Sequence, residues 1–173
     1  MDKLKLITDS TCDLSPELIE AHDIEVVPLY VELDGTYYED GVDLNANTMY
    51  DLVKETGSLP KTAASSSETF KRVFKESLNE GYEILYLGIG SKFSSTLQSA
   101  SIAKLELESD SVHLVDSANL SSGSGLLLLK AASLREAGQS ALAIKTAIEA
   151  MVPKVRSQFT INTLEYLYKG GRL

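Results

Sequence analysis

The chain has 173 residues, of which 43% are hydrophobic and 24% charged, and its formal net charge is −9. This length suits one full domain, and the composition is ordinary for a soluble globular protein. Because its 16 Lys and Arg residues are dispersed and outnumbered by 25 Asp and Glu residues, we expect no nucleic-acid partner. No apolar run approaches the about 20 residues of a membrane span, so no stable membrane insertion is expected.

The single cysteine, Cys12, cannot form an internal disulfide. The apolar stretch at the N-terminus is too short for the apolar region of a secretory signal and is typical of a first strand. We therefore expect a cytoplasmic protein whose partner is a small ligand or another protein.

Short apolar strands alternate with helices along most of the chain. The predicted strands cover residues 4–8, 24–33, 36–38, 84–89 and 112–115. The predicted helices start at Ser15 and cover 45–56, 65–78, 95–108, 121–137 and 140–152. Pro16 and Asn45 mark helix starts, Gly57 marks a helix end, and Ser65 with Glu68 has capping-box spacing. Asp34-Gly35 predicts a hairpin between 24–33 and 36–38.

This alternation predicts an α/β fold, with a doubly wound parallel sheet that carries helices on both faces. Ligands of such sheets bind beyond the carboxyl ends of the strands. Three hydroxyl-rich turns are predicted at that edge, at 62–67, at 90–96 and from Asp116 to 125. Hydroxyls and free backbone N–H groups at helix starts suit a small anion such as a carboxylate or a phosphate.

The last twenty residues differ from the rest. Pro153 ends a helix, 159–162 predicts a new strand, 164–169 starts a short helix, and the chain ends on a turn signal at 170–173. We expect residues 1–155 to form an α/β domain and 156–173 to begin a second, truncated α/β domain.

The turn at 90–96 lacks the spacing of a nucleotide-binding phosphate loop. Ser94 or Ser95 either binds a ligand or caps the following helix, whereas Thr62 lies outside the capping box, so its hydroxyl is less committed. Asp9 and Asp116 are followed by Ser10 and Ser117. Such aspartates suggest metal or base chemistry, but they more often accept loop N–H groups and shape the turn.

Several segments occur in the order typical of one bacterial family. They are Ile7-Thr8-Asp9-Ser10-Thr11-Cys12-Asp13-Leu14, Val27-Pro28-Leu29, Asp40-Gly41-Val42, Lys61-Thr62, Ser94-Ser95-Thr96-Leu97-Gln98-Ser99-Ala100, Val115-Asp116-Ser117 and Thr163-Leu164-Glu165-Tyr166-Leu167 to Gly170-Gly171-Arg172. Across its whole length the chain resembles the DegV family of fatty-acid-binding proteins. The resemblance implies the N-terminal domain of a two-domain DegV-like fold that encloses a long-chain fatty acid, such as palmitate, between its domains.

The resemblance also implies roles for individual residues. The family's carboxylate contacts lie in a Thr-Ser-Gln-Pro-Ser and a Leu-Ser-Gly-Thr motif, which here read Thr62-Ala63-Ala64-Ser65-Ser66 and Phe93-Ser94-Ser95-Thr96. Thr62 and Ser94 would therefore hold the carboxylate. The supporting loop residues are Asp9, Ser10, Ser95, Thr96, Asp116 and Ser117.

The family presents its fatty acid to a separate fatty acid kinase, which feeds acyl chains into phospholipid synthesis. The resemblance thus implies a carrier that is not an enzyme and that needs no metal and no cofactor. The alternative is a serine-dependent acyl or phosphate-ester hydrolase with Ser94 as nucleophile, which would need a base within hydrogen-bond reach.

The four leucines at 126–129 are open to two interpretations. They could line a tunnel for an acyl chain, or they could belong to an ordinary core, which is the commoner role of an apolar helix.

Overall fold

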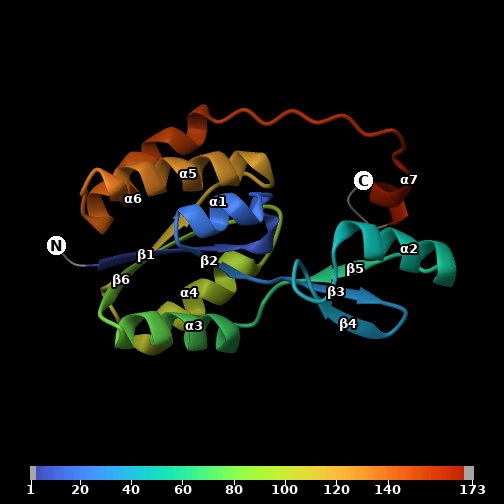
Figure 1. Cartoon of the computed structure of the whole chain (residues 1–173), viewed down its shortest axis with the longest axis horizontal. Helices are drawn as coiled ribbons and strands as arrows, with labels where there is room; N and C mark the ends of the chain where they lie inside the picture. The colour runs from blue at the N-terminus through green and yellow to red at the C-terminus, as the bar shows by residue number, and fades with distance from the viewer. Residues whose placement is uncertain (1–2, 170–173) are drawn as a thin grey trace.

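Four parallel strands form the main sheet of the computed structural model, which describes residues 3–169. They are β1 (Lys3–Asp9), β2 (Ile24–Val27), β6 (Tyr82–Gly88) and β7 (Val112–Asp116), in the order β2-β1-β6-β7. Leu6 pairs with Ile24 and Lys3 with Tyr82, so β1 lies in the middle of the sheet. All four carboxyl ends lie at one edge (Figure 1).

Helices cover both faces of this sheet. One face packs against α5 (Ser122–Glu136) and α6 (Ala141–Met151), and the other against α3 (Ser67–Asn79) and α4 (Thr96–Leu107). Side chains alternate between the two cores as a strand requires, with Leu4 and Leu6 in the first and Ile7 in the second. The doubly wound α/β fold predicted from the sequence is confirmed.

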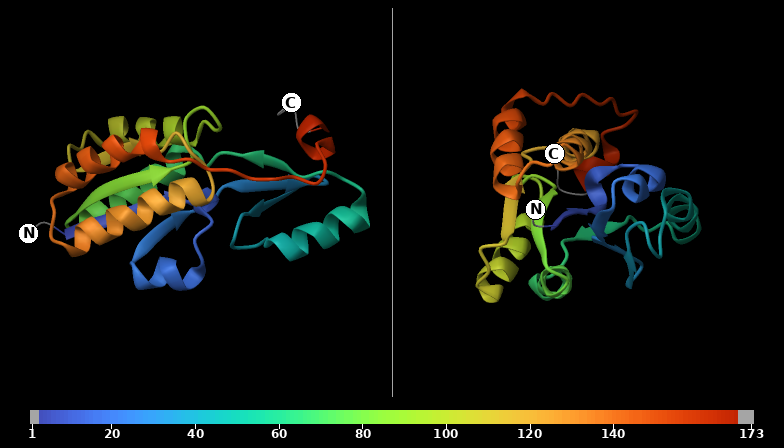
Figure 2. Two further views of the ribbon diagram at one scale, coloured as in Figure 1. Left: turned by 90° about the horizontal axis from the view of Figure 1, so that it is seen from above. Right: turned by 60° about the vertical axis from the view of Figure 1, so that its left-hand side comes forward.

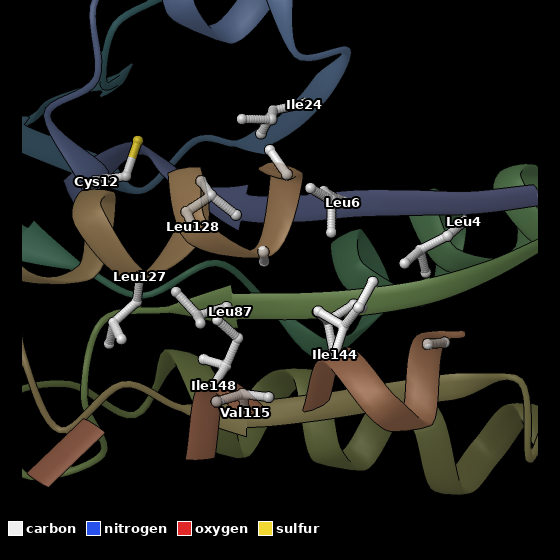
Figure 3. Packing of buried hydrophobic residues seen from close by; sticks show 14 residues of the cluster. Leu4, Leu6, Cys12, Ile24, Leu87, Val115, Leu127, Leu128, Ile144 and Ile148 are labelled. Atoms are coloured by element: carbon white, nitrogen blue, oxygen red, sulfur yellow. The ribbon is translucent and has the colours of Figure 1, made fainter. Parts of the chain in front are cut away.

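The α5 helix settles the question of the four leucines in part. Leu127 and Leu128 are buried against β1, β6 and α6 (Figure 3), so they belong to the core. Leu126 is 63% exposed and points away from it. None of the helices among residues 3–169 is long and apolar enough to cross a membrane.

A smaller antiparallel sheet corrects the prediction of one strand over 24–33. The chain leaves β2 at Pro28 and enters β3 (Tyr30–Leu33), which pairs with β4 (Thr36–Glu39) and β5 (Lys61–Ala63). Proline has no N–H for a sheet, so the apolar run divides into two strands at this point. We call residues 30–63, including α2 (Ala46–Thr56), the lobe. It projects from the carboxyl edge of the main sheet (Figure 1).

Local signals explain the lobe's turns. Asp34 and Gly35 have φ angles of 51° and 80°, the left-handed pair that a two-residue hairpin needs, as predicted. The Asn45 side chain accepts the Thr48 N–H at the start of α2, and Gly57 ends the helix with φ 68°.

The cap of α3 differs from the prediction by one residue. Ser66, not Ser65, accepts the Thr69 N–H and caps the helix. Ser65 is fully buried, and its hydroxyl donates to the carbonyl of Pro28 instead. A buried hydroxyl needs a partner, and the Pro28 carbonyl provides it.

A short helix, two 3-10 turns and the C-terminal segment complete the described chain. The α1 helix (Pro16–Ala21) starts after Ser15 as predicted, and 3-10 turns form at η1 (Ser10–Cys12) and η2 (Val152–Lys154). The strand predicted at 159–162 is wrong, because this segment is exposed and pairs with no strand of the described chain. It leads to α7 (Glu165–Lys169) on the lobe's side of the molecule (Figures 1 and 2). The turn predicted at 170–173 lies outside the described residues.

Candidate functional site

A cavity of about 480 Å³ lies where the lobe meets the carboxyl edge of the main sheet. It is lined by Thr11, Leu29, Thr62, Ala63, Ala64, Ile89, Phe93, Ser94, Ser95 and Leu120. Thr62 comes from β5 of the lobe, whereas Ser94 comes from the loop between β6 and α4. The sequence predicts Thr62 at the edge of the main sheet, and the structure corrects this. It still brings Thr62 and Ser94 to the same cavity.

Ser94 lines the cavity and also supports the helix that follows it. Its Oγ accepts the Thr96 N–H (3.2 Å), so Ser94 supports the first turn of α4. Ser95 occupies the N-cap position but makes no side-chain cap bond. The Oγ atoms of Ser94 and Thr96 lie 2.8 Å apart, and Thr96 is fully buried. When Thr96 donates this bond, the Ser94 proton remains available to an acceptor in the cavity.

Asp9 connects the ends of β1 and β6 behind the cavity. This fully buried carboxylate accepts the Ile89 N–H (2.8 Å), the Tyr86 hydroxyl (2.8 Å) and both the N–H and hydroxyl of Thr11 (3.1 and 2.6 Å). Four donors satisfy a charge that burial would otherwise make unfavourable. Asp9 therefore shapes the turn.

Tyr86 is held as the donor to Asp9. Its ring is fully buried and lies 5.1 Å from the Phe70 ring in an edge-on arrangement. Burial raises the pKa of Tyr86 well above its usual value, and the neighbouring Asp9 carboxylate raises it further. The phenol thus keeps its proton.

Asp116 likewise accepts hydrogen bonds from the loop that carries Ser94 and fixes its shape. Its carboxylate accepts the N–H and hydroxyl of Ser91 (3.1 and 2.5 Å) and the Ala118 N–H (2.9 Å). Partial burial alone would raise the pKa of Asp116, but these bonds outweigh it and the pKa is lowered. Ser117 is buried and bonds to the backbone of Asn119. Asp116 and Ser117 thus support the cavity from behind.

Ser10 bonds to the segment that connects the main sheet to the lobe. Its Oγ accepts the Leu29 N–H (3.1 Å), and it does not line the cavity. Of the eight residues singled out from the sequence, Thr62, Ser94 and Ser95 line the cavity. The other five lie at the end of β1, at the end of β7, at the start of α4 and in the turns that follow the two strands.

The lining supplies hydroxyl and apolar groups. Among the described lining residues there is no acid, base or histidine. His22 bonds to Glu136 (2.8 Å) and His113 lies 3.5 Å from Glu83, so neither accompanies Ser94. Burial raises the pKa of the Cys12 thiol, which makes it unreactive. Within residues 3–169 no cluster of metal-ligating side chains is assembled.

Seven of the ten lining residues were not predicted as site residues from the sequence: Thr11, Leu29, Ala63, Ala64, Ile89, Phe93 and Leu120. Leu29, Phe93 and Leu120 supply apolar walls, and the Thr11 hydroxyl is bonded to Asp9. An aromatic residue in a polar turn is a signal that the sequence offers, and Phe93, which is 54% exposed in the structure, is such a residue. Leu29 carries no such signal, because it lies within an apolar run.

The chain is similar to proteins of one family. Residues 3–173 match the family model described as "Uncharacterised protein, DegV family". The chain is 44% identical over its whole length to a DegV domain-containing protein of Clostridium acetobutylicum, of which it covers 62%. It therefore spans less than two thirds of that relative.

Two solved structures have a similar fold. One is described as showing fatty acid binding of a DegV family protein from Thermus thermophilus, with a TM-score of 0.87 and 37% identity over 98% of this chain and 60% of that one. The other is a stearic-acid-binding protein from Eubacterium ventriosum, with a TM-score of 0.88 and 32% identity over 98% and 60% of the two chains.

Proposed function

Since the chain belongs to the DegV family, we propose that it binds a long-chain fatty acid whose carboxylate is held by Thr62 and Ser94. The observation that carries this proposal is that Thr62, from the lobe, and Ser94, from the loop after β6, line one cavity with apolar walls. A carboxylate removed from water needs donors, and hydroxyls provide them without any catalytic group. The fatty acids named for the two similar structures support the same ligand class.

The acyl tail supplies most of the affinity in this proposal. Each buried CH₂ group contributes about 0.8 kcal/mol, so an acyl chain binds tightly once it is enclosed. We propose that residues 1–155 form one wall of that enclosure and that the segment from 156 begins a second α/β domain. The exposed side chains of Phe159 and Leu164 suit a surface that another domain covers.

The cellular role follows from the resemblance described above. We propose that the protein is a cytoplasmic carrier that presents its fatty acid to a fatty acid kinase for phospholipid synthesis, and that it is not itself an enzyme. The alternative hydrolase requires a base beside Ser94, and the described hydrogen-bond partner of that hydroxyl is Thr96.

Alanine substitutions test the carboxylate contacts. In the intact protein, Ser94→Ala and Thr62→Ala should each weaken palmitate binding by about 1.5–3 kcal/mol, the usual contribution of a hydrogen bond to a charged group. Ser101→Ala and Thr146→Ala remove hydroxyls that bond within α4 and α6, and they should change binding by less than about 0.5 kcal/mol. Calorimetry measures all four variants. Unchanged affinity in both site variants would exclude Thr62 and Ser94 from the site.

A head-group comparison separates acid recognition from tail binding. Palmitate should raise the melting temperature more than its methyl ester or the corresponding alcohol, because only the acid offers a carboxylate to the two hydroxyls. Equal stabilisation by all three compounds would mean that the tail alone is recognised.

A further inference from the structure

The two candidate carboxylate contacts lie on parts of the molecule that have separate cores. The lobe buries its own small set of side chains, Val31, Leu33 and Leu44. Neither core cluster of the main sheet includes a residue from 28–66, and no ion pair joins lobe and sheet within the described chain. Core packing therefore does not set the distance between Thr62 and Ser94.

The backbone joins the lobe to the main sheet at two neighbouring crossings. The chain enters the lobe through Pro28 and Leu29 and returns to α3 through Ala64 and Ser65 (Figure 1). Thr62 lies three residues before Ser65, and it pairs with Val31 two residues after Leu29. Any change at the crossings is thus transmitted to Thr62 through a short, paired stretch of backbone.

Two serine side chains hold a single peptide group at this crossing. The carbonyl of the bond between Pro28 and Leu29 accepts the hydroxyl of Ser65, and the N–H of the same group donates to Ser10 Oγ (3.1 Å). Ser65 is fully buried, Leu29 is 8% exposed, and Ser10 follows directly on β1. The peptide is therefore fixed from the main sheet on one side and from the returning chain on the other.

We propose that Ser10 and Ser65 are positioning residues that fix the lobe on the main sheet and so hold Thr62 opposite Ser94. Ser65 ties the outgoing chain to the returning chain, and Ser10 ties both to the end of β1. Neither residue contacts the ligand in this scheme. Their role rests on the proposed function, because it concerns how the two carboxylate contacts are kept in register.

A double-mutant cycle tests this role in the intact protein. Ser65→Ala should weaken palmitate binding about five- to tenfold, because a displaced Thr62 loses part of its hydrogen bond to the charged group. In a Thr62→Ala background the same substitution should add less than about twofold, since Ser65 acts through Thr62. Ser66→Ala is the matched control: it removes the cap of α3 and lowers the melting temperature, but it should leave affinity within about twofold. Equal losses from Ser65→Ala in both backgrounds, or no loss in either, would overturn the proposal.

A measurement without ligand separates this proposal from the proposed function. Hydrogen exchange of the Leu29 amide should become at least about tenfold faster in Ser10→Ala, because this substitution removes the acceptor of the amide. It should become faster to the same extent in Ser65→Ala, although Ser65 bonds only to the carbonyl side of the peptide group. Ser66→Ala should leave that amide unchanged. If Leu29 exchange does not respond to Ser65→Ala, the two serines do not act together and the positioning role is refuted. If palmitate affinity is insensitive to Thr62→Ala, the assigned carboxylate contact fails, and the positioning role fails with it whatever the exchange data show.

Discussion

Removing the Tyr86 hydroxyl should destabilise the protein by a predictable amount. Tyr86→Phe deletes one of four donors to the buried Asp9 carboxylate and leaves the ring, which packs on Phe70 and Phe74, in place. A hydrogen bond to a charged group contributes about 1.5–3 kcal/mol. For a protein of this size, that corresponds to a fall in melting temperature of about 3–12 °C.

Urea unfolding followed by circular dichroism measures the change, provided that the m-value is unaltered. Tyr82→Phe is the control, because it makes the same chemical change four residues earlier on β6, where the ring lies beneath Lys3 and Lys5. We expect that control to change stability by less than about 0.5 kcal/mol. If Tyr86→Phe were equally neutral, the bond to Asp9 would not stabilise the carboxyl edge and the account of that edge would be refuted.

The same bond predicts a pH dependence of a definite sign. The pKa of Tyr86 is raised in the folded protein, whereas an unfolded chain releases this proton near pH 10. The stabilisation is therefore fully present below about pH 10 and is lost as the pH rises from there toward the folded pKa. The stability difference between the parent and Tyr86→Phe should be constant in neutral solution and shrink in alkali. A constant difference up to pH 11 would contradict this reasoning.

Two further predictions concern the same edge and the thiol behind it. In Gly90→Ala the new Cβ would lie 2.8 Å from the Ala118 Cα, so backbone must move; thermal unfolding should show a loss of about 1–3 kcal/mol, and an unchanged melting temperature would contradict the packing. Cys12 is 4% exposed and burial raises its pKa, so a disulfide reagent at pH 7.5 should modify it far more slowly in the folded protein than in urea, and equal rates would show that the thiol is accessible.

The main sheet and its helices could be predicted from the sequence because their signals are local. Ser15 and Pro16 mark the start of α1 as expected, and the apolar runs before 90–96 and before Asp116 became β6 and β7. Buried parallel strands read as short apolar runs, and that pattern was present. The loop role favoured for Asp9 was also evident from its position at a strand end.

The lobe's hairpin and α2 could be predicted, but its separate sheet could not, because β3 and β5 depend on tertiary pairing. Residues 24–33 form one apolar run, and only the partners of β2 and β3 show that it serves two sheets. β5 has three residues, all exposed, and carries no strand pattern of its own. The strand predicted at 159–162 fails for the converse reason, since its β-forming residues meet no partner in the described chain. Ser65 and Ser66 are both plausible caps in sequence, and only the Pro28 carbonyl distinguishes them.

The route of the chain through the lobe has a consequence for how the protein folds. β1 must pair with β6 across a long intervening segment, and such distant pairings are slow because the loop must close first. About half of that segment is the lobe, whose hairpin at Asp34-Gly35 closes locally and early. Once Ser65 bonds to Pro28, the two ends of the lobe are joined. The loop that must close is then about half as long, and the entropic free-energy cost of closing it falls by about 0.6 kcal/mol. We therefore expect the central strand pair to form sooner than its sequence separation alone would suggest.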